Sequence, residues 1–192
     1  ATEIYTLSLH DALPICDSYT HGECVNRPND IASVLRDLTK KGILNLAHIG
    51  NGPLMEYATL REYLASKKVK NVLWMYYEGN DLTDLNNELQ DPILVKYLNN
   101  LEFSQDLILK QDIINSSGKI KINHEIDRQN KKQIENIFSF LKLSLIRNNF
   151  IFKNQHETLP QEKFKEILYL SNELVRKNNS NFYFVYLPDY YR

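Results

Sequence analysis

Val69-Lys70-Asn71-Val72-Leu73-Trp74-Met75-Tyr76-Tyr77 is the stretch of this chain that decides its fold. From Val72 onward the run is apolar or aromatic at every position, with no alternation of polar residues. Such a run is typical of a central parallel strand whose two faces are both covered. The stretch therefore predicts an α/β protein with this strand in the middle of its sheet.

The segments around this strand alternate between strand and helix patterns. Strands are predicted at 43–47 and 181–187, and helices at 30–41, 54–66 and 159–177. Strands that alternate with amphipathic helices along the chain favour a doubly wound sheet. We therefore predict a three-layer α/β/α fold with a flavodoxin-like parallel sheet.

A long segment from about 82 to 153 interrupts this order after the third strand. A crossover in such a fold needs only roughly 10–12 residues or slightly more, so this segment predicts a helical insertion. Helices are predicted at 82–89, within 92–114 and at 131–147, with a break at Ser116-Ser117-Gly118. Two roles stay open for it: a lid or substrate-binding wall, and a helical cover without a role in chemistry.

The N-terminal segment Thr2–Ile15 resembles the translation of a DNA-sequencing adapter, and we exclude it from functional reasoning. The domain is then expected at 16–192, truncated at both ends and without its natural first strand, which Tyr5–Leu9 is apolar enough to imitate. Cys16 stands where we expect glycine in the natural protein. A side chain at that position would be strained if the turn requires a positive φ.

Composition excludes several classes of function. The formal net charge of −1 gives no electrostatic reason to expect a nucleic acid or an anionic membrane as a partner. Cys24 is the single cysteine we take as native, so neither a disulfide framework nor a cysteine metal site is expected. No apolar run is long enough to span a bilayer. The wealth of Asn, Lys and Ile indicates an AT-rich bacterial genome, and specifies neither a compartment nor an oligomeric state.

Three short clusters follow the predicted strands, and together they indicate an acyl-transfer site. They occupy residues 17–22, 45–52 and 78–81. Because parallel strands end at one edge of the sheet, Ser18, Gly50 and Asn80 are expected to be neighbours in space. A serine can serve as nucleophile, and a glycine N–H and an asparagine amide can donate to an oxyanion. Taken singly, each cluster is most simply a turn; the combination in this order is what favours chemistry.

The clusters resemble the blocks of the SGNH (GDSL-type) hydrolase family. The first block is matched by Cys16-Asp17-Ser18 with Gly22, the second by Gly50, and the third, in compressed form, by Glu78-Gly79-Asn80-Asp81. The resemblance implies that Ser18 is the nucleophile of an ester hydrolase. It implies an oxyanion hole made by the N–H groups of Ser18 and Gly50 and by the side-chain amide of Asn80.

The family's last block, Asp-x-x-His, supplies the catalytic base, and it is absent from these 192 residues. We therefore expect a serine esterase as the parent protein, acting on a small-molecule or carbohydrate ester without a cofactor or metal, and almost no activity from this chain. The remaining site residues are expected to support the turn or line the pocket. They are Asp17, which supports the nucleophile turn, and His21, His48, Asn51 and Asp81.

Two other functions share this scaffold. An acyltransferase, for example one that moves an acetyl group to or from a polysaccharide, would use the same nucleophile with a different acceptor. A flavodoxin-like module would bind phosphate in the loop that holds Ser18, Thr20 and Gly22. The flavin-binding alternative leaves Asn80 without a role and places Glu23 beside the phosphate.

Overall fold

The computed structural model describes residues 10–23, 25–116 and 159–189, and the chain divides into two compact units. The first unit comprises residues 1–105 and 159–192, and the second comprises 106–158. The second unit is described at 106–116, where residues 111–116 are helical. All other elements below belong to the first unit, which also holds the three predicted site clusters.

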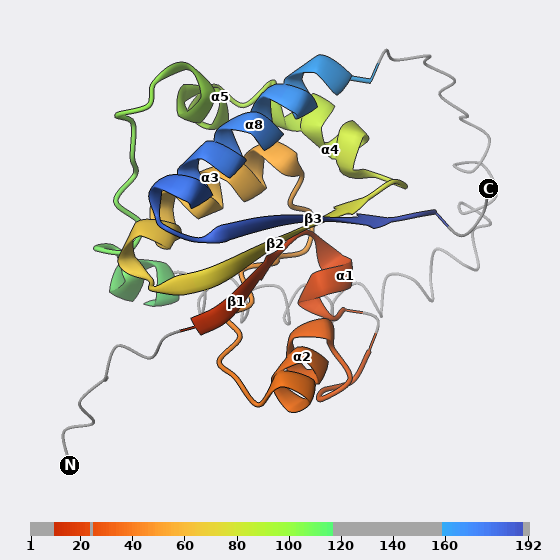
Figure 1. Cartoon of the computed structure of the whole chain (residues 1–192). Helices are drawn as coiled ribbons and strands as arrows, with labels where there is room; N and C mark the ends of the chain where they lie inside the picture. Colours follow the sequence, from red (N-terminus) through yellow and green to blue (C-terminus); the bar gives the residue numbers. More distant parts are fainter. Residues whose placement is uncertain (1–9, 24, 117–158, 190–192) are drawn as a thin grey trace, which may run out of the picture. The chain divides into compact units, whose positions relative to one another are not determined.

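A small parallel sheet of three strands, in the order β1-β2-β3, forms the centre of the first unit (Figure 1). The strands are β1 (His10–Ile15), β2 (Val69–Tyr77) and β3 (Asn181–Leu187). Leu13, Val72 and Phe182 lie side by side across them. The prediction of a mixed α/β protein with residues 69–77 as its central strand is thus confirmed.

The first strand comes from the segment that we excluded as adapter-like. In β1, Leu13 and Ile15 are fully buried and belong to the main core. The alternative first strand, Tyr5–Leu9, falls outside the described residues. Whatever the origin of this segment, residues 10–15 of this chain occupy the position of a first strand.

The prediction of a regular strand at 43–47 is wrong, because within this segment only Ile43 forms a β-bridge, opposite Ala12 of β1. The segment nevertheless follows β1, because the N–H groups of Leu44, Leu46 and His48 donate to the carbonyls of Ala12, Pro14 and Cys16 at 3.0, 3.1 and 3.3 Å. A regular parallel ladder would also need the N–H of residue 14 to donate to the carbonyl of Leu44. Pro14 has no N–H, so this bond cannot form, whereas the N–H of Ala12 still donates to the carbonyl of Gly42 at 3.5 Å.

The helices lie close to their predicted places. They are α1 (Ser18–His21), α2 (Ile31–Thr39), α3 (Pro53–Tyr63) with the 3₁₀ turn η1 (Leu64–Ser66), α4 (Asp81–Glu88), α5 (Pro92–Asn99) and α8 (Gln161–Lys177). Asp30 caps α2 by accepting the N–H of Ser33 at 2.9 Å. The predicted helix at 131–147 lies outside the described residues. Within the described part of the chain, no helix is both long and apolar enough to cross a membrane.

Helices cover both faces of the sheet, with α3 and α8 on one side and α1 and α2 on the other (Figure 1). On the first face, Trp74 of β2 packs with apolar side chains of α3 and α8 in the main core. On the second face, Ala32 of α2 packs against Ala12 of β1. The start of the predicted insertion belongs to the main core as well, through Leu85 of α4 and Tyr97 of α5.

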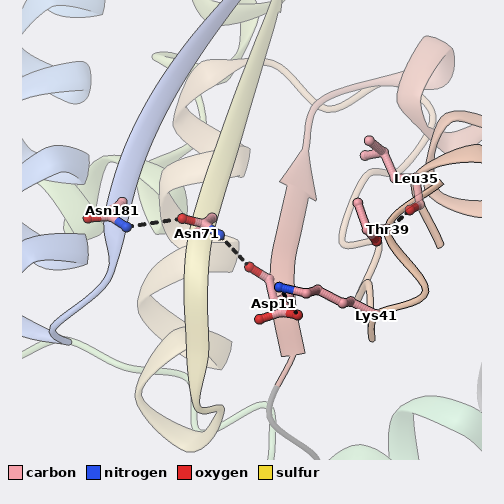
Figure 2. A network of polar contacts seen from close by, with 6 residues as sticks. All are labelled: Asp11, Leu35, Thr39, Lys41, Asn71 and Asn181. Carbon is pink, nitrogen blue, oxygen red and sulfur yellow. Dashed lines mark hydrogen bonds and ion pairs between the residues drawn. The ribbon is translucent and has the colours of Figure 1, made fainter.

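An asparagine network ties the strands together at the end opposite the site (Figure 2). The amide of Asn71 in β2 donates to the carbonyl of Asp11 in β1 at 2.8 Å. Its oxygen accepts from Asn181 of β3 at 3.1 Å. Lys41 adds an ion pair to Asp11 at 3.1 Å. One side chain thus links three strands at their amino ends, leaving the carboxyl ends for the site loops.

Candidate active site

Ser18 stands at the first position of α1, directly beyond the carboxyl end of β1. Asp17 caps this short helix, because its Oδ1 accepts the N–H of Tyr19 at 3.0 Å. Asp17 is 1% exposed, whereas Ser18 is partly exposed. The turn therefore buries the carboxylate and presents the hydroxyl.

Cys16, which precedes this turn, does not have the conformation that would strain a side chain. The non-glycine residues with positive φ in the described chain are Lys40, Asp106 and Asn179. Cys16 is fully buried and packs with Ala47 and Met75. The condition for strain at position 16, a positive φ, is thus not met.

Asn80 and Ser18 both donate hydrogen bonds to the carboxylate of Asp17. Asn80 precedes the first turn of α4, and its Nδ2 donates to Asp17 Oδ2 at 3.2 Å and to Asp84 Oδ2 at 2.8 Å. The hydroxyl of Ser18 donates to the same Asp17 Oδ2 at 3.5 Å. Asp17 and Asn80 are 63 residues apart in the sequence. The first and third clusters thus converge on one oxygen atom.

The second cluster adjoins the first. His48 donates its N–H to the carbonyl of Cys16 at 3.3 Å, and His21 Nδ1 lies 3.1 Å from the carbonyl of Ala47. Gly50 has φ +79°, and a Cβ there would meet nothing within 4 Å. Gly50 is exposed, and its backbone lies in the left-handed region, which glycine adopts without strain. The turn closes through the N–H of Asn51, which donates to the carbonyl of His48 at 3.2 Å.

Two histidines lie beside the nucleophile turn. Their ring centroids are 5.7 Å apart. Because a carbonyl only accepts, the contact with Ala47 requires a hydrogen on His21 Nδ1, and Nε2 is then the acceptor of the neutral ring. His48 Nδ1 lies 2.9 Å from the carbonyl of Ile49 in the same way. Both rings thus lie beside the nucleophile turn, and their Nδ1 atoms contact main-chain carbonyls rather than Ser18.

A group of carboxyl side chains lies near the start of α4, and the sequence had indicated only two of them. Asp17, Glu56, Asp81 and Glu88 are buried, and Asp84 is half-buried. The three in α4 recur at spacings of three and four residues, which puts them on one helix face. That spacing was the available signal, but charged residues on a helix face are usually solvated, so the burial of two of them was not evident.

The environment of Glu56, Asp81 and Glu88 raises the pKa of each of these groups. Burial, and next the negative charge of Asp81, raise the pKa of Glu56 far above its usual range. Burial raises the pKa of Asp81 to about 8, against the lowering effect of the N–H of Tyr77. Burial also raises the pKa of Glu88 to about 7.

Neither oxygen of Glu56 has a hydrogen-bond partner among the described residues, and Asp81 Oδ1 has none either. Across the described ranges, no three His, Cys, Asp or Glu side chains are arranged to bind a metal ion.

Two surface hollows, of about 290 and 540 Å³, lie away from the predicted site residues. The smaller one adjoins the asparagine network of Figure 2. The larger one lies between α8 and β3 and is lined by Asn172, Arg176, Ser180, Asn181, Phe182 and Tyr183. Neither hollow is lined by Ser18, Gly50 or Asn80.

Comparison with known proteins adds no relative: no family model, no curated protein and no solved structure matches this chain. The case for a function rests on the residues and their geometry.

Proposed function

We propose that this chain carries the nucleophile and oxyanion-hole residues of a serine ester hydrolase with the SGNH (GDSL-type) arrangement. The observation that carries the proposal is the convergence of Ser18 and Asn80 on Asp17 Oδ2. A nucleophile and an amide donor from separate strand ends meet there. The order of segments 42–48, β1, β2 and β3 across the sheet supports the doubly wound, flavodoxin-like fold that this arrangement uses.

In the proposed reaction, Ser18 Oγ attacks the carbonyl carbon of an ester of a small molecule or carbohydrate. The carbonyl oxygen becomes an oxyanion, which the N–H groups of Ser18 and Gly50 and the amide of Asn80 stabilise. Both N–H groups of Asn80 are bonded to carboxylates in the free chain. We expect the longer bond, to Asp17, to be exchanged for the oxyanion.

The proton of Ser18 must pass to a base, which returns it to the departing alcohol. Water then hydrolyses the acyl-enzyme. The Asp-x-x-His block that would supply the base is absent from these residues. A serine hydroxyl without a base is a poor nucleophile near neutral pH, so we expect slow turnover by this chain.

The test uses an external base. The chain is treated with a fluorophosphonate probe and with an aryl acetate, each with and without imidazole, and the labelled residue is mapped. We expect imidazole to accelerate a labelling that is located on Ser18 and lost in Ser18→Ala. Ser66→Ala, which removes an exposed hydroxyl in η1, is the matched control and should behave as the unaltered chain. Labelling that does not depend on Ser18, or none at all with imidazole present, would overturn the proposal.

A further inference from the structure

Glu88, at the end of α4, holds the loop that contains Gly50. Its Oε1 accepts the N–H of Gly52 at 2.7 Å, and its Oε2 accepts the N–H of Leu54 at 2.9 Å. Gly52 occupies the N-cap position of α3 and has no side chain to cap the helix. The carboxylate of another helix thus takes over the capping, at the end of α3 where a negative charge is favourable.

The loop and α4 are in close contact at Gly52. A Cβ on Gly52 would lie 2.8 Å from Asp84 Cβ and 2.8 Å from Glu88 Oε2. Only a residue without a side chain allows this approach. The contact fixes the loop against the same turns of α4 that carry Asp84 and Glu88.

The same helix also fixes Asn80. Asn80 directly precedes α4 and bonds to Asp84 in its first turns, while Glu88 is the last residue of the helix. α4 therefore contacts Asn80 at its start and, through Gly52 and Leu54, the segment that follows Gly50 at its end. A short rigid helix can set the distance between them.

We propose that Glu88 is a positioning residue that holds the Gly50 loop in place relative to Asn80 for oxyanion stabilisation. This inference rests on the proposed function. It assigns no contact between Glu88 and the substrate. Glu88 acts through the main chain of Gly52 and Leu54, so its loss should affect the rate of acylation more than the affinity for the reagent.

The test compares Glu88→Gln with Glu62→Gln. Glutamine has the size of glutamate, but one of its two polar atoms is an NH₂ donor. That donor would face the main-chain N–H of Gly52 or Leu54, so one of the two hydrogen bonds would be lost. Glu62 is a matched control: it is 8% exposed against 9% for Glu88, and it also accepts a main-chain N–H at 2.7 Å, from Gln105. Glu62 belongs to α3, and its carboxylate accepts from Tyr97 of α5 and from Gln105 in the loop that follows, outside the three clusters.

We expect Glu88→Gln to lower the maximal rate of imidazole-assisted Ser18 labelling by about 10- to 100-fold, short of the loss of a whole donor. The probe concentration that gives half the maximal rate should not change. Glu62→Gln should leave the labelling rate within about twofold, at a temperature where circular dichroism shows both variants folded. Hydrogen exchange at the amides of Gly52 and Leu54 should become faster in Glu88→Gln alone.

Equal labelling rates in the two variants, or unchanged exchange at Gly52 and Leu54, would overturn the positioning role. Labelling that persists in Ser18→Ala would overturn the proposed function instead. The exchange measurement does not depend on activity, so the two failures are distinguishable.

Discussion

Asp17 serves four donors with one buried carboxylate. Its Oδ1 accepts the N–H of Tyr19 and lies 3.4 Å from the thiol of Cys16, and its Oδ2 accepts from Ser18 and Asn80. A carboxylate so occupied is a fixed acceptor that orders the turn. The supporting role implied for Asp17 stays a prediction. Because Asn80 shares this acceptor with Ser18, it is the residue whose loss is most informative.

We expect Asn80→Ala to slow Ser18-dependent acylation by about 10²–10³, the usual cost of one lost oxyanion donor. The measurement is the imidazole-assisted rate with an aryl acetate, separated into kcat and KM. Asn87→Ala, an exposed asparagine of the same helix, is the control and should retain the full rate. A change confined to KM would show that Asn80 is only a turn residue.

Gly50 and Asn80 lie in turns that follow the segments predicted as strands, whereas the strand before Asp17 and Ser18 comes from residues that we had excluded. The sequence could not predict the buried acids beside them. Glu88 is a charged residue in a short polar helix, a pattern that is usually solvated. Its burial depends on the packing of α4 against α3, a tertiary property that composition does not carry.

Among the secondary structure elements, α5 depends on a contact that no local pattern predicts. The guanidinium of Arg61 in α3 donates to the carbonyls of Tyr97, Asn100, Leu101 and Phe103 at 2.6, 3.1, 2.6 and 2.7 Å. The last carbonyls of a helix have no partner within it. Arg61 therefore anchors the C-terminal end of α5 and the loop beyond it to α3.

We expect Arg61→Lys to lower the free energy of unfolding by about 2–3 kcal/mol, because one ammonium cannot reach four carbonyls in fork geometry. The measurement is denaturant unfolding followed by circular dichroism. Arg176→Lys, at an exposed position of α8, is the matched control and should stay within about 0.5 kcal/mol of the unaltered chain. Equal losses in the two variants would contradict the anchoring role.

Helices and strands differed in how well the sequence predicted them. β2 and β3 both occur at the predicted residues, but the apolar run of β3 had indicated a buried strand. No residue of β3 is buried, and Tyr183, Phe184 and Tyr186 are 50, 45 and 49% exposed. The strand at 43–47 failed for a reason located elsewhere: the proline at position 14 of its neighbour cannot donate. Strand regularity depends on the partner, whereas helix bonds are local, so the helices were predicted to within a few residues.

For the whole molecule, the buried acids determine how stability depends on pH. A carboxyl group with a higher pKa in the folded than in the unfolded chain stabilises the fold fully below its unfolded pKa of roughly 4. This stabilisation is lost as the pH rises through the folded value. For Glu88 and Asp81 the folded pKa values are about 7 and about 8, and burial also raises the pKa of Glu56 well above its usual range. We therefore expect the fold to lose stability as the pH rises from about 5 to 8.

We expect Glu56→Gln to reduce this loss, because glutamine fills the same space and needs no proton. The difference in Tm between Glu56→Gln and the unaltered chain should grow as the pH rises. In a chain of this size, each 1 kcal/mol of recovered stability corresponds to about 2–4 °C. The measurement is thermal unfolding in a series of buffers between these pH values. Glu162→Gln, an exposed residue of α8, should keep the original slope. A slope in Glu56→Gln equal to that of Glu162→Gln would contradict the assignment.

Trp74 gives the sheet an optical signal of its own. It is the single tryptophan in the 192 residues, it is fully buried, and its ring lies 6.1 Å from that of Phe182 in β3. An indole enclosed in the central strand should fluoresce at short wavelengths and resist quenching by iodide. Separation of β2 from its neighbours would expose it, and the emission would shift to the red. Fluorescence from this one residue can therefore report the integrity of the sheet without any label.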